Sequence, residues 1–185
     1  MRTEFVQPEG ERLTIERSGR ETDGELLEMK ATYNPYSDLP PLHYHPFQEE
    51  QFEVLRGRFR VVAGEREAVH EPGDRFTIPA NTPHGMQNIA DEAGHLLWQV
   101  RPARKTEDLL TTLWGLGADG KTGADGVPNL LQLAVLFQAY SDEIRLAKPP
   151  LFVQRLLFGL LAPIGRLFGY RVRYEKYSGE QAKSG

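Results

Sequence analysis

The chain has 185 residues, enough for one substantial hydrophobic core, and it has no cysteine, which excludes disulfides, thiolate metal sites and cysteine nucleophiles. Its formal net charge of -4 at pH 7 argues against nucleic-acid binding by the main body of the protein. The N-terminus lacks the apolar stretch of a signal peptide, and the absence of cysteine fits a reducing compartment, so we expect a cytoplasmic location.

The first part of the chain predicts a series of short strands separated by Gly, Pro, Asn or Asp, a pattern typical of a β-sandwich or barrel. The expected strands lie at 12–17, 25–33, 42–45, 50–55, 58–63, 66–70, 75–78, 84–89 and 95–101. Arg56 and Gly57 lie between two alternating runs. They predict a two-residue hairpin turn in which the glycine supplies a positive φ.

The pattern becomes helical after Arg104. Side chains typical of helix caps, and prolines that end helices, delimit three expected helices at 106–114, 129–147 and 151–169. Pro163 predicts a break in the third helix. A loop rich in Gly and Asp, 115–128, should separate the first two helices, and the C-terminal run YRVRYEKYS predicts either a strand or a loose tail.

Two histidines and two adjacent glutamates lie in the stretch PPLHYHPFQEEQFEVLRG, residues 40–57. Side chains two residues apart in a strand point to the same face, so His43 and His45 share one face. If Phe52 faces the core, Glu50 faces it as well, and Glu49 faces water. An inward carboxylate must be paired or bound to a metal, and the two histidines just upstream provide a partner for it.

A third histidine, His84, follows a turn rich in Pro and Asn and opens the next alternating run. Together with His43, His45 and Glu50 it makes a set of three imidazoles and one carboxylate, which suits one divalent transition metal such as Fe, Mn, Ni, Cu or Zn. A lone HxH pair is more often an ordinary surface pair, but the two added residues favour a metal site. The other two histidines, His70 and His95, match no part of the pattern, and we interpret them as ordinary turn and strand-end residues.

Both stretches resemble the two sequence motifs of the cupin superfamily. The first motif, G-x5-H-x-H-x(3,4)-E-x6-G, is matched from Ser37 to Gly57, with the serine in place of the leading glycine. The second, G-x5-P-x-G-x2-H-x3-N, is matched from Gly73 to Asn88, with Asn81 in place of the inner glycine. That change is mild because asparagine tolerates the left-handed conformation. The resemblance implies a double-stranded β-helix, a small jelly-roll barrel, with the metal inside it.

The resemblance allows dioxygenases, decarboxylases, sugar isomerases and proteins without known chemistry, and a fold does not choose among them. Strand alternation places six candidate substrate-pocket residues on the inner face of the barrel: Met29, Tyr33, Phe52, Phe59, Met86 and Gln99. The set is mostly apolar or aromatic and includes no basic residue. It therefore favours a flat or apolar organic substrate over a phosphosugar or a small dianion such as oxalate.

We therefore expect a mononuclear-metal oxygenase or dioxygenase that acts on an apolar or aromatic small molecule, with Glu50 as a metal ligand that also takes the substrate's proton. One alternative is a metallo-cupin that senses or carries a small molecule without turnover. Another is a metal-dependent isomerase or decarboxylase.

We expect two domains, a cupin β-barrel at 1–104 and a helical extension at 105–185. Within the extension, residues 145–177 carry seven basic side chains and one acid, a net of +6, which leaves a net of -10 on the rest of the chain. The uncharged interval between Arg155 and Arg166 has ten residues, too short to span a bilayer, which takes about 20. We expect packing on the barrel or a homodimer interface, the latter by the resemblance, ahead of peripheral contact of 151–170 with an anionic membrane.

Overall fold

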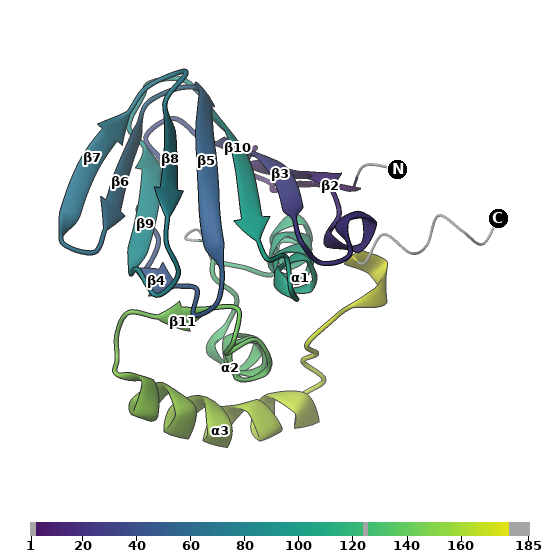
Figure 1. Cartoon of the computed structure of the whole chain (residues 1–185). Helices are drawn as coiled ribbons and strands as arrows, with labels where there is room; N and C mark the ends of the chain where they lie inside the picture. The colour runs from purple at the N-terminus through teal and green to yellow at the C-terminus, as the bar shows by residue number, and fades with distance from the viewer. Residues whose placement is uncertain (1–2, 124–125, 178–185) are drawn as a thin grey trace.

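Two antiparallel sheets form the body of the protein in this computed structural model, which describes residues 3–123 and 126–177 (Figure 1). One sheet has six strands in the order β1-β2-β3-β10-β5-β8, and the other has five in the order β11-β4-β9-β6-β7. Three helices lie beside and below the sheets (Figure 1). The predicted fold class, a mainly β barrel of the jelly-roll type with a C-terminal helical extension, is confirmed. The strands are β1 (Thr3–Val6), β2 (Arg12–Arg17), β3 (Leu27–Tyr33), β4 (His43–Tyr44), β5 (Glu49–Arg56), β6 (Phe59–Ala63), β7 (Arg66–His70), β8 (Arg75–Ile78), β9 (His84–Asn88), β10 (Gly94–Arg101) and β11 (Arg145–Leu146).

The barrel interior is filled by two clusters of buried apolar side chains. One cluster is built mainly by β2, β3 and β10, and includes Leu13, Leu27 and Met29. The other is built by β5, β6, β8, β9 and β10. Alternate residues along β5 are buried, as expected for a strand with one face on the core. This alternation carries a carboxylate, Glu50, into the interior together with Phe52.

The hairpin predicted at Arg56 and Gly57 is wrong. β5 pairs with β8 and β10, whereas β6 pairs with β7 and β9, so the chain passes from one sheet to the other at this point. Gly57 has a φ of 85°, and a Cβ there would lie 2.8 Å from Cα of Gly94. A sheet crossing and a tight hairpin both require a glycine in this conformation, so the local sequence does not distinguish them.

The helices differ in length from the prediction. They are α1 (Thr106–Ala118), α2 (Leu130–Ala139) and α3 (Leu151–Leu167). α1 continues into the predicted loop, where Gly115 and Gly117 make room for Tyr177 and Gln7, which lie against the helix. α2 ends eight residues earlier than predicted, and the chain then forms β11, which pairs with β4.

The break predicted at Pro163 is also wrong, since α3 runs through it without interruption. A helical proline crowds the carbonyl of the residue four positions earlier, which here is Gly159, and α3 stays helical at both positions. The C-terminal run forms no strand in its described part. It ends in a short 3₁₀ turn, Glu175–Tyr177, and residues 178–185 lie outside the described residues.

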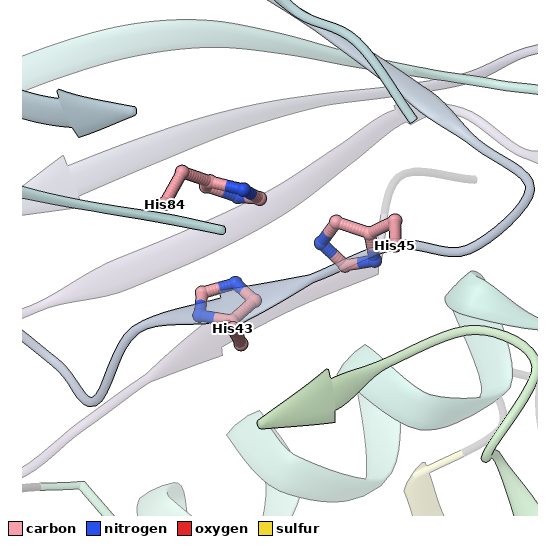
Figure 2. A group of neighbouring side chains, drawn as sticks. All are labelled: His43, His45 and His84. Carbon is pink, nitrogen blue, oxygen red and sulfur yellow. The ribbon is translucent and has the colours of Figure 1, made fainter. Parts of the chain in front are cut away.

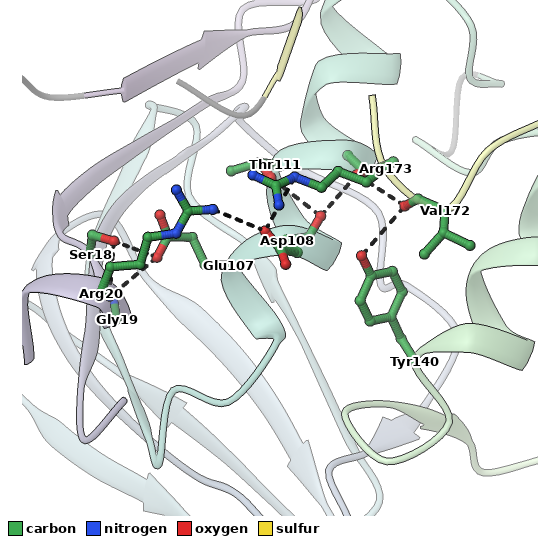
Figure 3. A network of polar contacts seen from close by, with 10 residues as sticks. Ser18, Gly19, Arg20, Glu107, Asp108, Thr111, Tyr140, Val172 and Arg173 are labelled. Carbon is green, nitrogen blue, oxygen red and sulfur yellow. Dashed lines mark hydrogen bonds and ion pairs between the residues drawn. The ribbon is translucent and has the colours of Figure 1, made fainter. Parts of the chain in front are cut away.

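The start of α1 contacts both an N-terminal and a C-terminal segment of the chain (Figure 3). Glu107 accepts hydrogen bonds from the Ser18 hydroxyl at 2.7 Å and from the Gly19 backbone at 3.0 Å. Asp108 lies 3.5 Å from Arg20 and 3.7 Å from Arg173. The first turn of this helix therefore bridges segments that are far apart in the sequence.

The part of the chain that the structure describes contains no helix with both the length and the apolar character needed to cross a bilayer.

The domain boundary predicted at residue 104 stays a prediction. The extension beyond it does not stay apart from the barrel, because β11 forms the edge of the five-stranded sheet.

Candidate metal centre

Three histidine side chains converge at one end of the five-stranded sheet. His43 lies on β4, His45 follows that strand directly, and His84 begins β9. β4 and β9 are antiparallel neighbours in which His43 pairs with His84. One ring nitrogen from each histidine lies within 4.8 Å of the others, and Figure 2 shows the three rings around a shared space. The sheet register thus brings together residues that are about 40 positions apart.

Glu50 reaches the same space from β5 of the opposite sheet. Its Oε2 lies 2.8 Å from Nε2 of His84 and 3.4 Å from Nε2 of His45. Only 1% of the residue is exposed, which confirms that Glu50 faces inward. Glu49 points away from the cluster and accepts a hydrogen bond from Gln51 at 2.8 Å.

Each histidine is oriented by a backbone carbonyl on the far side of its ring. The Nδ1 atoms lie 3.1 Å from the carbonyl oxygen of Pro41 for His43, 2.5 Å from that of Glu143 for His45, and 2.9 Å from that of Thr82 for His84. A carbonyl only accepts, so Nδ1 donates, and in the neutral imidazole Nε2 keeps its lone pair. This is the usual arrangement of a histidine that binds a metal through Nε2.

The inner atoms of the cluster lack ordinary partners. Nε2 of His45 and Oε2 of Glu50 are buried and have no contact with the geometry of a hydrogen bond. A buried polar atom without a partner is costly, and a cation between these atoms would remove that cost. Three imidazoles and one carboxylate are also a suitable donor set for a divalent transition metal, so the residues present fit such an ion.

The protonation states of Glu50 and His43 favour the same interpretation. Burial by itself raises the pKa of Glu50, but the surrounding imidazoles outweigh burial and lower the pKa from 4.5 to about 2. Burial and the two neighbouring imidazoles lower the pKa of His43 to about 4. Burial lowers the pKa of His84, but the nearby Glu50 carboxylate outweighs it, so that the pKa of His84 is raised. Near neutral pH, the Glu50 carboxylate and the His43 imidazole are thus in the forms that bind metals.

The two positions that depart from the glycines of the motifs also have structural roles. Asn81 has a φ of 62°, which confirms the left-handed conformation expected there. Its backbone N–H donates to the carbonyl of His45 at 2.9 Å, and its side chain donates to that of Pro46 at 3.1 Å. The hydroxyl of Ser37 accepts a hydrogen bond from the backbone of Asn88 at 2.9 Å. Asn81 therefore ties the second motif directly to the histidine pair of the first.

A family model described as "Cupin domain" matches residues 29–100, a range that contains both motifs and all four residues of the cluster. Residues 29–100 are a cupin domain. Two further strands, β1 and β2, precede the matched range, and the three helices follow it.

Solved structures of similar chains include KdgF from a Halomonas species, with 20% identity over 55% of this chain and 87% of that chain and a TM-score of 0.47. An RmlC-like cupin from Shewanella frigidimarina has 23% identity over 56% of this chain and 87% of that one, with a TM-score of 0.47. A "predicted oxalate decarboxylase" from Thermotoga maritima has 15% identity over 50% of this chain and 80% of that one, also with a TM-score of 0.47.

A cavity of about 300 Å³ borders the cupin domain at His43, which is half-buried. Its wall is mostly apolar and comes largely from the helical extension. The lining includes Leu113 and Trp114 of α1, Leu133 and Phe137 of α2, and Ile144 and Leu146 around β11. The prolines Pro40 and Pro41 complete the wall on the barrel side. These helical residues could not be assigned to the site from the sequence, because only the folded chain brings them to His43.

None of the six pocket residues predicted from strand alternation lines this cavity. Met29 belongs to one core cluster of the cupin domain, and Phe52, Phe59 and Met86 belong to the other. Tyr33 lies between the clusters, with its ring at 80° to that of Phe59 and 5.4 Å from it. Five of the six therefore pack in the barrel core.

The sixth residue, Gln99, faces the other side of the sheet, contrary to the prediction. Its side chain donates to Glu28 at 2.5 Å, whereas its neighbour Trp98 points inward and donates from Nε1 to Oε1 of Glu50 at 3.0 Å. β10 has apolar residues at consecutive positions, Leu96 and Leu97, so its phase is ambiguous from the sequence alone. Trp98 is the residue of the site that the sequence interpretation missed for this reason.

The remaining histidines lie outside the cluster, as expected. His70 stacks on Phe76 with ring centroids 4.2 Å apart and lies 3.8 Å from Asp74. Nδ1 of His95 lies 3.1 Å from the hydroxyl of Thr32 on the adjacent strand β3.

Proposed function

We propose that this chain is a mononuclear-metal oxygenase that acts on an apolar or aromatic small molecule. The observation that carries the proposal is the apolar cavity at His43, because it places a substrate-sized space next to a donor set suited to a redox-active metal. The proposed ligands are His43, His45, Glu50 and His84. The wall of this cavity offers no cluster of basic side chains, which disfavours phosphosugars and small dianions.

When bound, the metal would supply Lewis acidity and electron transfer. The chain's own residues would hold the ligands, bind the substrate and exclude water. The Trp98 indole keeps Oε1 of Glu50 occupied, so that Oε2 is the atom directed at the histidines. Leu133 and Phe137 would contact an apolar substrate, and Trp114, which also lines the cavity, would stack on an aromatic one.

The role of Glu50 as proton acceptor from the substrate stays a prediction. A pKa of about 2 keeps the carboxylate ionised but makes it a weak base. These properties support its role as a ligand more directly than its role as a base.

Metal analysis tests whether the four proposed ligands bind a metal. We expect untagged protein to contain close to one transition-metal ion per chain, and His84→Ala to lose it. His95→Ala is the matched control, because His95 lies outside the cluster and should leave the metal content unchanged. An unchanged metal content in His84→Ala would reject the site.

Oxygen consumption tests whether the metal-loaded protein is an oxygenase. Protein purified without oxygen and loaded with Fe(II), Mn(II), Ni(II) or Cu(II) should consume O2 in the presence of some member of a panel of flavonols and diketones. Trp114→Ala should raise KM for an aromatic substrate while leaving the metal content unchanged. Metal-loaded protein that consumes no O2 across the panel would overturn the oxygenase. If an apolar ligand then raises the melting temperature and is recovered unchanged, the protein is a metal-dependent carrier or sensor.

A further inference from the structure

Helix α3 is apolar on two opposite sides. One side packs against α2 through Phe158, Ala162 and Gly165, which are all buried. The other side is exposed, and its large hydrophobic side chains are Phe152, Leu156, Leu157, Leu160 and Ile164 of the helix, followed by Leu167 and Phe168 at its end. Of the thirteen exposed large hydrophobic residues among those the structure describes, these seven lie in one segment. We call this set the α3 outer face.

The α3 outer face lies on the outside of the molecule. In Figure 1, α2 lies between α3 and the barrel, and α3 runs across the lower edge of the molecule. At roughly 100° per residue, the exposed apolar side chains of the helix cover an arc of about 140° around its axis. Phe152 lies at one edge of this arc and Leu157 at the other. Leu160 is 64% exposed and Leu167 is 88% exposed, so the described part of the chain leaves the centre of this arc uncovered.

Basic side chains flank the α3 outer face on one side. Arg155 and Arg166 are both exposed and lie about 20° apart around the axis, next to the apolar arc. The helix contains no Asp or Glu. At the C-terminal end of the helix, Arg166, Arg171 and Arg173 line a hollow of about 440 Å³, and Arg173 also pairs with Asp108 of α1. The partner of this face should therefore be apolar and negatively charged.

We propose that the α3 outer face binds the surface of an anionic lipid bilayer, with the helix lying in the plane of the interface. The apolar side chains would enter the boundary between headgroups and acyl chains, while the arginine side chains extend to the lipid phosphates. A second copy of the chain fits less well, because two such faces would bring arginines together without any carboxylate of the helix to pair with them.

Vesicle flotation of the full chain at low salt tests the proposal. We expect the protein to float with vesicles of phosphatidylcholine and phosphatidylserine, and much less with phosphatidylcholine alone. Arg155→Gln combined with Arg166→Gln should weaken partitioning into the anionic vesicles about thirtyfold, at about 1 kcal/mol per basic residue. The matched control is Arg58→Gln combined with Arg66→Gln. These two exposed arginines belong to the barrel, so their replacement should change the partitioning into anionic vesicles little.

The contribution of the apolar side chains to vesicle binding is tested separately. Leu160→Gln should weaken partitioning by roughly tenfold, since a buried leucine side chain is lost from the interface. Val69→Gln is its control, because Val69 is 48% exposed but lies on β7 of the barrel. Circular dichroism should show that all variants are folded, as their side chains are exposed.

Two results would overturn the proposal. One is the absence of flotation with anionic vesicles at low salt, and the other is flotation that the α3 variants leave unchanged. A dimer in solution that Leu160→Gln dissociates, without vesicle binding, would assign the face to a second copy instead.

Discussion

At the scale of single residues, the candidate centre depends on Trp98, a side chain outside both histidine motifs. Its indole N–H is the hydrogen-bond donor to Oε1 of Glu50, and only 1% of Glu50 is exposed. The backbone carbonyls behind the three histidines act in the same way, since each fixes the nitrogen that faces the cluster. Orientation by such partners commonly affects metal affinity as much as some ligands do.

We expect Trp98→Phe to lower the metal affinity by roughly 10–100-fold, because the Glu50 carboxylate loses the donor that orients it. The measurement is a competition titration of the metal against a chelator. The control is Trp114→Phe, which changes the chain's other tryptophan and leaves the ligand set untouched. Equal affinities for Trp98→Phe and the unchanged protein would show that the indole does not position the carboxylate.

At the scale of elements, α2 and α3 can approach closely because α3 has a glycine at their contact. A Cβ at Gly165 would lie 2.8 Å from the backbone oxygen of Leu131 and 2.9 Å from a methyl group of Val135. Gly159 lies on the same helix, but no atom lies within 4 Å of the Cβ it would acquire. The two glycines therefore allow a direct comparison within one helix.

We expect Gly165→Ala to lower the free energy of unfolding by about 1–3 kcal/mol, because the two helices must separate to accommodate the methyl group. Gly159→Ala should instead raise it by about 0.5–1 kcal/mol, from the higher helix propensity of alanine. Urea denaturation measures both. A Gly165→Ala protein as stable as the Gly159→Ala protein would contradict the close packing of α2 on α3.

The C-terminal segment is held against α1 by a charged contact. Asp119 accepts a hydrogen bond from the Tyr177 hydroxyl at 2.6 Å and forms an ion pair with Lys176. The contact with Lys176, together with the Tyr177 bond, lowers the pKa of Asp119 from its ordinary value of 3.8 to about 2. A carboxyl whose pKa is lower in the folded state stabilises the fold above its ordinary pKa.

The stabilisation from Asp119 should therefore be complete above about pH 4 and lost as the pH falls through about 2. We expect Asp119→Asn to be less stable than the unchanged protein at neutral pH, and the two to converge at the acid end of this range. Denaturation at a series of pH values measures the difference. A difference that is independent of pH would show that the charge of Asp119 does not hold the segment.

At the scale of the whole molecule, the candidate centre joins both sheets and the extension. The histidines belong to the five-stranded sheet or to the turn after β4, Glu50 belongs to the six-stranded sheet, and the carbonyl of Glu143 reaches His45 from the extension. A metal bound here would therefore link parts of the chain that come together only in the folded state. Such binding stabilises the native state by mass action.

We expect removal of the metal by a chelator to lower the melting temperature. With free metal at about 100 times its Kd, the loss corresponds to about 2.7 kcal/mol. For a chain of this size, that is a shift of roughly 5–10 °C. Differential scanning calorimetry before and after chelation measures it, and His84→Ala should show no shift. Metal-containing protein with the same melting temperature after chelation would contradict the link between the sheets.

The sequence by itself determined the barrel class, the histidines and the choice of Glu50 over Glu49. These features follow from strand alternation and motif spacing, which act over a few residues. The alternation was informative along β5, where polar and apolar residues alternate from Gln51 to Val54, and misleading at Gln99, because β10 has apolar residues on both faces.

Only the tertiary structure decided which side chains surround the site. The chain's path between the sheets at Gly57, the pairing of β11 with β4, and the cavity between His43 and the helices all depend on contacts between distant segments. A local pattern carries no information on such contacts, because the same glycine serves a hairpin or a crossing and the same apolar helix residue serves a core or a cavity wall. The residues of the candidate centre were therefore predictable from spacing, whereas the wall of the cavity beside it depended on how the extension folds back on the barrel.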